Sequence, residues 1–267
     1  MSPGGCARLA PADAAMRVVV TRPAQEGRRW VRQLAERGHD ALALPLIAIT
    51  AAPDAGALAQ ARDLLPEVQA VMFVSANAVH GFFHAPTAWP PATRAWAPGP
   101  GTRAALLAAG VPAGHVDAPA EDSHQFDSEQ LWHVVRGQVR AGDRVLLVRG
   151  ADAQGRSQGR EWLGQQLAAA GVQVATVAAY ARGFPTWSNQ QVELARGAAA
   201  DGSIWLFSSS EAAANLGRLL PGQPWTTARA IATHPRIAEA VRALGFGNIQ
   251  AARPGFADVV ASIESAR

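Results

Sequence analysis

Short apolar or β-branched runs alternate along this chain with longer stretches of helical periodicity. In the first such stretch, apolar residues recur at i, i+3, i+4 and i+7 from Gly27, and Gly38 follows as a left-handed stop. Gly171 is expected to end the corresponding later helix. This alternation predicts parallel sheets covered by helices, and therefore the α/β class. The expected strands are 17–21, 41–45, 70–74, 94–97, 144–148, 173–177, 203–207 and 229–232, with weaker ones near 115–118 and 248–251.

An internal duplication organises these elements. Residues 17–23 (RVVVTRP) are echoed by residues 144–150 (RVLLVRG), and each segment leads into a helix with a Trp, a Gln-Leu pair and a closing Gly. Two later pairs of segments keep the same order, 71–78 with 204–211 and 93–97 with 228–232. The chain is therefore predicted to contain two copies of one unit. Segments 45–53 and 177–185 occupy equivalent places in the two copies and are predicted to be extended connectors closed by proline.

Composition removes several classes of mechanism. All 24 basic residues of the 267 are Arg. A Schiff-base enzyme, a pyridoxal phosphate enzyme and a Walker A nucleotide site each need a lysine amine, so all three are excluded. The single cysteine, Cys6, excludes an intramolecular disulfide and a cysteine-built zinc or iron–sulfur site.

Charge and hydropathy indicate a cytoplasmic protein. The net charge of +3 is small and dispersed, which argues against a nucleic-acid partner. No run approaches the ~20 apolar residues of a membrane span, so we expect no membrane partner. Residues 1–15 lack the pattern of a signal peptide, and we expect them to form a disordered leader.

Candidate binding groups follow the predicted strands, because open parallel sheets bind ligands at the carboxyl ends of their strands. Ser75 and Ser208–Ser210 offer hydroxyl caps beside free backbone N–H groups, which bind anions. Thr102 and Thr233 could cap the helices that begin after two other strands, and Pro235 suits a first helical position. The alternative for each hydroxyl is that it only caps its helix.

Four arginines lie near the same turns and supply bidentate donors suited to carboxylates or phosphates. They are Arg22, Arg103, Arg149 and Arg236. Their alternative role is to keep the surface soluble. Because both copies of the duplication repeat the arrangement, a shared anionic ligand is favoured.

Two familiar motifs do not fit their context. The run Gly99-x-Gly101-x-x-Ala104 matches the dinucleotide fingerprint, but a proline separates its glycines and the duplicate turn at 232–236 has none. Residues 155–159 (GRSQG) match the hydrolase elbow, yet they begin well beyond the preceding strand. His80 and His84 are spaced i, i+4 without a third ligand nearby, so we predict no metal site.

Tyr180 is the only tyrosine of the chain, and it breaks the symmetry of the duplication. It stands in the second connector where the first has Ile47. A phenol can donate a proton to a leaving hydroxyl, so Tyr180 is the candidate acid. The alternative is a tyrosine that only packs in its connector.

The sequence resembles the uroporphyrinogen-III synthase family over residues 16–267, through motifs that are short but specific in their order and spacing. These motifs are Val19–Pro23, Leu44–Ile47, Phe73–Val79, Gly99–Thr102, Val148–Gly150, Gly159–Leu163, Tyr180, Phe207–Ser209 and Thr233–Arg236. The turn at 232–236 departs from many members, which carry a glycine there, and residues 151–158 exceed the expected loop and could alter access to the site.

The resemblance implies two flavodoxin-like parallel-sheet domains joined by a two-stranded β connector, with the chain crossing twice. Domain one would combine residues 16–47 with 185–267, and domain two would hold 53–176. The connectors would be 48–52 and 177–184.

The resemblance also implies a function: a cofactor-free lyase of haem biosynthesis that dehydrates and cyclises hydroxymethylbilane, inverting ring D to give uroporphyrinogen III. Tyr180 would assist the departing hydroxyl. The implied substrate-binding positions are Thr21, Arg22, Ser75, Asn77, Gly99, Thr102, Arg149, Gly150, Ser208, Ser209, Thr233, His234 and Arg236. We expect a monomer that receives its substrate by transient hand-over from hydroxymethylbilane synthase.

Two other functions stay open at this point. One is a non-catalytic two-domain receptor for an anionic metabolite, which would use the same helix ends without turnover. The other is a nucleotide-dependent transferase with Gly99–Thr102 as its phosphate loop.

Overall fold

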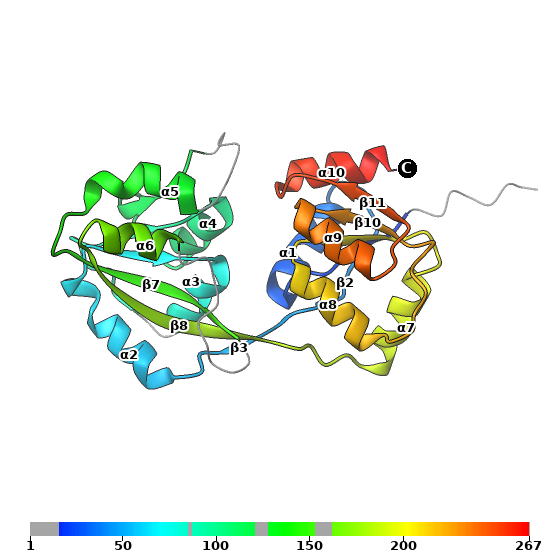
Figure 1. Ribbon diagram of the computed structural model, residues 1–267, viewed down its shortest axis with the longest axis horizontal. Coiled ribbons are helices and arrows are strands. Elements are labelled where there is room, and N and C mark those ends of the chain that lie inside the picture. Colours follow the sequence, from blue (N-terminus) through cyan, green and yellow to red (C-terminus); the bar gives the residue numbers. More distant parts are fainter. Residues whose placement is uncertain (1–15, 85–86, 121–127, 153–161, 267) are drawn as a thin grey trace, which may run out of the picture. The chain divides into compact units, whose positions relative to one another are not determined.

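The computed structural model describes residues 16–84, 87–120, 128–152 and 162–266 (Figure 1). The expected leader, the hydrolase-like run 155–159 and most of the extra residues 151–158 lie outside this description. Two compact units make up the chain. Unit 1 comprises the residues up to Ala48 and those from Phe184 on, and unit 2 comprises Ile49–Gly183, so the chain passes between the units twice.

Unit 1 is built on a five-stranded parallel sheet with the order β11-β10-β9-β1-β2. Its strands are β1 (Val18–Val20), β2 (Ala41–Ala43), β9 (Ile204–Phe207), β10 (Arg229–Ala232) and β11 (Asn248–Ala251). Its helices are α1 (Ala24–Ala35), α7 (Asn189–Ala198), α8 (Ser210–Leu219), α9 (Pro235–Ala243) and α10 (Phe256–Ser265).

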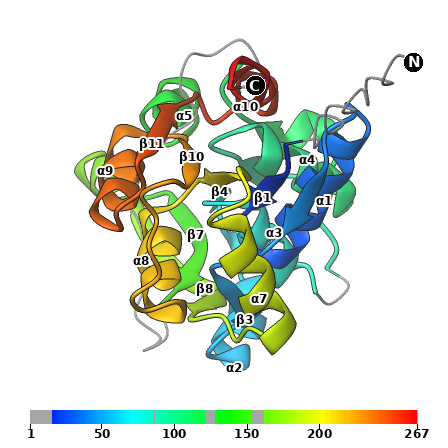
Figure 2. The ribbon, with the colours of Figure 1, turned by 90° about the vertical axis from the view of Figure 1, so that its right-hand side faces the viewer.

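Side chains alternate between the two faces of this sheet, as strands require. On one face Leu206 packs with Trp30 and Leu34 of α1 and with α10. On the other, Trp205 and Phe207 pack edge-to-face against Phe246, Trp205 packs edge-to-face against Trp225, and Trp225 stacks on Phe246. Figures 1 and 2 show α8 and α9 side by side on one side of the sheet and α1 on the other. Both faces are therefore buried, which explains the continuous apolar runs of the strands.

Unit 2 is built on a six-stranded sheet with the order β3-β8-β7-β4-β5-β6, in which parallel ladders join β8 through to β6. Its strands are β3 (Ala48–Ala51), β4 (Ala70–Phe73), β5 (Arg94–Trp96), β6 (Val116–Asp117), β7 (Arg144–Ala151) and β8 (Gln173–Gly183). Its α-helices are α2 (Ala55–Asp63), α3 (Ala76–Phe82), α4 (Pro100–Ala108), α5 (Ser128–Val135) and α6 (Trp162–Ala169), and short 3₁₀ turns cover Leu65–Glu67, Ala113–His115 and Arg136–Gln138.

The predicted elements lie close to the observed ones. Each of the ten expected strands contains or overlaps an observed one, and the α/β class with mostly parallel sheets is confirmed. Helix α1 buries Gly27, Trp30 and Leu34 as its periodicity predicts, and Gly38 and Gly171 have φ of 77° and 76°. In the described ranges, no helix has the length and apolarity needed to cross a membrane.

One element differs from its expected length. Strand β8 continues to Gly183 through the segment that we expected as a separate connector (Figure 1). It can do so because β7 is also long and pairs with it as far as Ala181, past a register shift between Arg149 and Gly150. Tyr180 therefore lies in a strand that is paired with β7, opposite Gly150.

Candidate functional site

Tyr180 is buried on β8 and hydrogen-bonded to the cap of a helix. Only 2% of its surface is exposed, and its Oη lies 3.2 Å from Oγ of Ser75. Ser75 is the N-cap of α3, as the sequence predicts, and its Oγ accepts a hydrogen bond of 3.2 Å from the backbone N–H of Ala78. The phenol is thus held in a network that begins at the carboxyl end of β4.

The ring of Tyr180 lies directly against the backbone of Gly150 on β7. A Cβ atom added at Gly150 would lie 2.5 Å from Cζ and 2.8 Å from Oη of the tyrosine. Helix α3 approaches β8 just as closely, because a Cβ at Gly81 would overlap the carbonyl oxygen of Ala179. Gly150 allows the ring of Tyr180 to pack against β7, and Gly81 allows α3 to pack against β8.

Arg149, next to Gly150, is a buried cation without a partner among the described residues. Its exposed fraction is 9%, and its Nε has no hydrogen-bond partner there. Leaving a buried charged donor unsatisfied is costly, so this guanidinium is poised to take an anionic acceptor.

Arg22 is the equivalent residue of unit 1, and its surroundings differ. Its Nη1 lies 2.6 Å from Oε1 of Glu26, and its guanidinium lies over the ring of Trp30, 4.1 Å from the centroid. Burial lowers the pKa of Arg22 while the charge of Glu26 opposes that shift, and an arginine stays protonated throughout the physiological range. Its Nε, like that of Arg149, is buried without a partner in the described part.

The carboxyl edge of the unit 1 sheet gathers the turns after β1, β9 and β10. Thr21 is 1% exposed and its hydroxyl donates to the carbonyl of Leu206 at 2.7 Å, so it braces neighbouring strands. The backbone N–H of Thr233 similarly donates to the carbonyl of Phe207 at 3.1 Å. His234 caps α9, since its Nδ1 accepts from the backbone N–H of Arg236 at 3.2 Å.

Four α-helices begin without a side-chain cap among the described residues. They are α1 after Pro23, α4 after Gly99, α8 after Ser209 and α10 after Gly255. Their first backbone N–H groups therefore have no side-chain acceptor, and such helix ends favour anions. In unit 1 the uncapped start of α1 directly follows Arg22, and in unit 2 the uncapped α4 begins after β5.

The structure distributes the predicted site residues over two sheet edges, one in each unit. Unit 1 carries Thr21, Arg22, Ser208, Ser209, Thr233, His234 and Arg236. Unit 2 carries Ser75, Asn77, Gly99, Thr102, Arg149, Gly150 and Tyr180.

Two expected caps were wrong. Gly99 and not Thr102 precedes α4, and His234 and not Thr233 caps α9. The reason is that each helix begins at a proline, Pro100 or Pro235, which occupies the first helical position and makes its predecessor the cap. Thr102 is instead a helical residue and only 7% exposed.

Sequence reasoning missed two residues of this region. Glu26 lies four residues after Arg22, a spacing that brings side chains together at the start of a helix. Arg182 lies two residues after Tyr180 on β8, and its Nη2 donates to the phenol Oη at 3.4 Å. Residues two apart on a strand share a face, so the i+2 spacing was the available signal.

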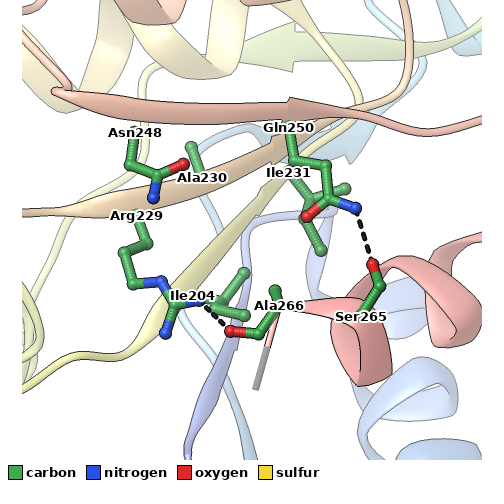
Figure 3. Close-up of a pocket in the computed structure, with 8 residues that line it drawn as sticks. All are labelled: Ile204, Arg229, Ala230, Ile231, Asn248, Gln250, Ser265 and Ala266. Carbon is green, nitrogen blue, oxygen red and sulfur yellow. Dashed lines mark hydrogen bonds between the residues drawn. The ribbon is translucent and has the colours of Figure 1, made fainter.

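No metal cluster marks these edges in the described part of the chain. In the described ranges no group of three His, Cys, Asp or Glu could hold a metal, and Nδ1 of His84 lies 2.8 Å from Nη2 of Arg62. A pocket of about 230 Å³ lies at the opposite, amino-terminal edge of the unit 1 sheet (Figure 3). Two of its polar side chains already have partners, because Arg229 donates to the carbonyl of Ala266 and Gln250 to Ser265.

Comparisons with known proteins agree on one family. The family model described as uroporphyrinogen-III synthase HemD matches residues 28–261. No curated protein sequence matches the chain. Two similar solved structures each align with 94% of this chain. The uroporphyrinogen-III synthetase of Helicobacter pylori is 14% identical, with a TM-score of 0.56 and 100% of its own chain covered. A mutant uroporphyrinogen III synthase of Thermus thermophilus is 16% identical, with a TM-score of 0.54 and 98% of its own chain covered. At these identities the structures support the fold.

Proposed function

The chain belongs to the uroporphyrinogen-III synthase family, and from that premise we propose that it dehydrates and cyclises hydroxymethylbilane, inverting ring D to give uroporphyrinogen III. The family is a lyase family of haem biosynthesis. The observation that carries the proposal is the buried Tyr180, with its phenol bonded to Ser75 at the carboxyl edge of the unit 2 sheet.

In the proposed reaction Tyr180 donates its proton to the departing hydroxyl of the substrate. The carbon–oxygen bond breaks with its electron pair going to oxygen, water leaves, and the substrate, which keeps its pyrrole N–H, becomes an azafulvenium cation. This intermediate closes through a spiro species before ring D is inverted. A positioned acid suits this step because hydroxide leaves poorly unless it is protonated. No cofactor enters the scheme.

The substrate is a polycarboxylate, and the two edges supply groups that bind carboxylates. We assign Arg149, Arg22 and the uncapped starts of α1, α4 and α8 as the main carboxylate-binding groups, since each offers N–H donors without a complete set of partners. The remaining proposed positions are Thr21, Ser75, Asn77, Thr102, Gly150, Ser208, Thr233, His234 and Arg236.

We further propose that both units derive from one flavodoxin-like ancestor. The strand orders of the two sheets are β2-β1-β9-β10-β11 and, without β3, β8-β7-β4-β5-β6. If β1 and β7 are each counted as strand 1, and β2 and β8 as strand 2, both orders become 2-1-3-4-5, which is the flavodoxin-like order. The second unit is then a circularly permuted copy, with β3 and the end of β8 as the paired connector. A monomer, a cytoplasmic location and hand-over of the substrate from hydroxymethylbilane synthase complete the proposal.

The experiment that tests the function is a coupled assay with resolved products. Hydroxymethylbilane is generated in situ, the protein is added, and the oxidised porphyrin isomers I and III are separated by chromatography. The proposal predicts dominant isomer III. Isomer I alone, the spontaneous product, from a folded sample would contradict the enzymatic function and favour a non-catalytic receptor.

A further inference from the structure

We propose that Arg182 is a positioning residue for the proton of Tyr180, an inference that rests on the proposed function. Arg182 follows Tyr180 by two residues on β8, so both side chains lie on one face of the strand. Its Nη2 donates to the phenol Oη at 3.4 Å, and its guanidinium carbon lies 6.0 Å from the centre of the tyrosine ring. The cation is therefore held beside the oxygen that is assigned to proton transfer.

The donors and acceptors around this oxygen determine where its proton can point. A phenol oxygen donates one hydrogen bond and accepts two, whereas a guanidinium can only donate. Oγ of Ser75 already accepts from the N–H of Ala78, and its own hydrogen is available for Tyr180 at 3.2 Å. With Ser75 and Arg182 both donating, neither consumes the phenol hydrogen, which is left for the substrate.

The same two donors serve the state that follows proton transfer. Once the proton has moved to the leaving hydroxyl and water has formed, the tyrosine oxygen is a phenolate that can only accept. Ser75 must then donate to it, and the bond from Arg182 becomes charge-assisted on both sides, which strengthens it in a buried site. The proton returns to the oxygen when the ring closure releases one from the attacking pyrrole.

A competing role for Arg182 is direct binding of a substrate carboxylate, and a double-mutant cycle separates the two. If Arg182 acts through Tyr180, Arg182→Met should lower kcat by about tenfold, which is the scale of one lost hydrogen bond to a charged group. The same substitution should then change KM by less than about twofold. Arg182→Lys should recover most of the rate, because an ammonium can also donate. In a Tyr180→Phe background, Arg182→Met should cause no further loss.

A spectroscopic readout is available because the chain has one tyrosine. The Raman doublet of that tyrosine distinguishes a phenol oxygen that accepts hydrogen bonds from one that donates. Wild-type protein should give the acceptor pattern, and Arg182→Met should shift it toward the donor pattern. The matched control is Arg218→Met, which removes a guanidinium lying 4.2 Å from the ring centre of Phe184 in the other unit and should leave the doublet and kcat unchanged.

The outcomes separate this inference from the function on which it rests. A folded wild-type protein that makes no isomer III would overturn both the proposed function and the positioning role of Arg182. An active wild type in which Arg182→Met slows the Tyr180→Phe background equally, or raises KM with kcat intact, would overturn the positioning role alone. A donor-type doublet in the wild type would overturn it too, even if Arg182→Met did not fold.

Discussion

Arg22 and Arg149 stand at the same place in the two copies of the duplicated unit, yet their surroundings differ. Arg22 is paired with Glu26 and covered by Trp30, whereas Arg149 has no partner among the described residues. The next residue differs as well: Pro23 precedes α1, and its counterpart Gly150 leaves room for the ring of Tyr180. Arg22 is thus held by partners within its own unit, whereas the described residues give Arg149 none.

The comparison teaches that a shared topology does not make the two edges equivalent. Both sheets bring the turns of adjacent parallel strands to one edge, which suits anions in each unit. In the described chain, the network of phenol, hydroxyl and guanidinium occurs in unit 2. We therefore assign the proton transfer to unit 2 and carboxylate binding to both.

Substituting Gly150 is expected to have the largest effect on this comparison. In Gly150→Ala the new methyl would lie 2.5 Å from Cζ of Tyr180, so the ring must move. Misplacing a reacting group by about 1 Å can cost ~100-fold in rate, and overpacking costs about 1–3 kcal/mol of stability. Steady-state kinetics and urea unfolding measure both. The control Gly137→Ala has nothing within 4 Å of its added Cβ and should behave as wild type. A fully active Gly150→Ala would show that close packing does not place the phenol.

Exchanging each arginine for methionine should separate binding from stability. Arg149→Met removes an unpaired buried cation, so the free energy of unfolding should hold or rise while KM increases about tenfold. Arg22→Met loses the ion pair with Glu26 and the contact with Trp30, which should lower the free energy of unfolding by about 1–2 kcal/mol. Urea titration and initial rates test both variants. If Arg22→Met and Arg149→Met lowered the free energy of unfolding equally, the proposed difference between the two arginines would be wrong.

The helix caps give the smallest expected difference. Ser75→Ala removes the acceptor of the Ala78 N–H and should lower the free energy of unfolding by about 1 kcal/mol. Ser209→Ala removes no side-chain cap bond, so its cost should stay within a few tenths of a kcal/mol. Thermal unfolding of the two variants side by side measures the difference. A larger loss in Ser209→Ala would mean that its hydroxyl has a structural role.

Much of the fold could be predicted from the sequence, because buried parallel strands are written as apolar runs such as 70–74 and 203–207. The helix ends at Gly38 and Gly171 were equally predictable, because the left-handed conformation that follows a helix favours glycine. The caps of α4 and α9 were misplaced by the prolines that open these helices. Periodicity alone does not resolve such one- or two-residue shifts.

The site was predictable only in part. Local rules located Ser75 and singled out Tyr180, because each stands out within its own segment. The bond between them joins residues 105 positions apart and depends on the pairing of β8 with β7, which no local pattern encodes. Arg182 was missed although residues 177–184 were expected to be an extended connector, in which residues two apart lie on one face.

The most direct test of the central claim is the rate and isomer distribution of Tyr180→Phe in the coupled assay. The substitution removes the proton donor and keeps the ring against Gly150, and circular dichroism verifies that the variant is folded. The account predicts a fall in the rate of isomer III synthesis of at least about 100-fold, the lower range for a general acid, with isomer I accumulating instead. A folded Tyr180→Phe that makes isomer III at the wild-type rate would contradict the assignment of proton transfer to Tyr180.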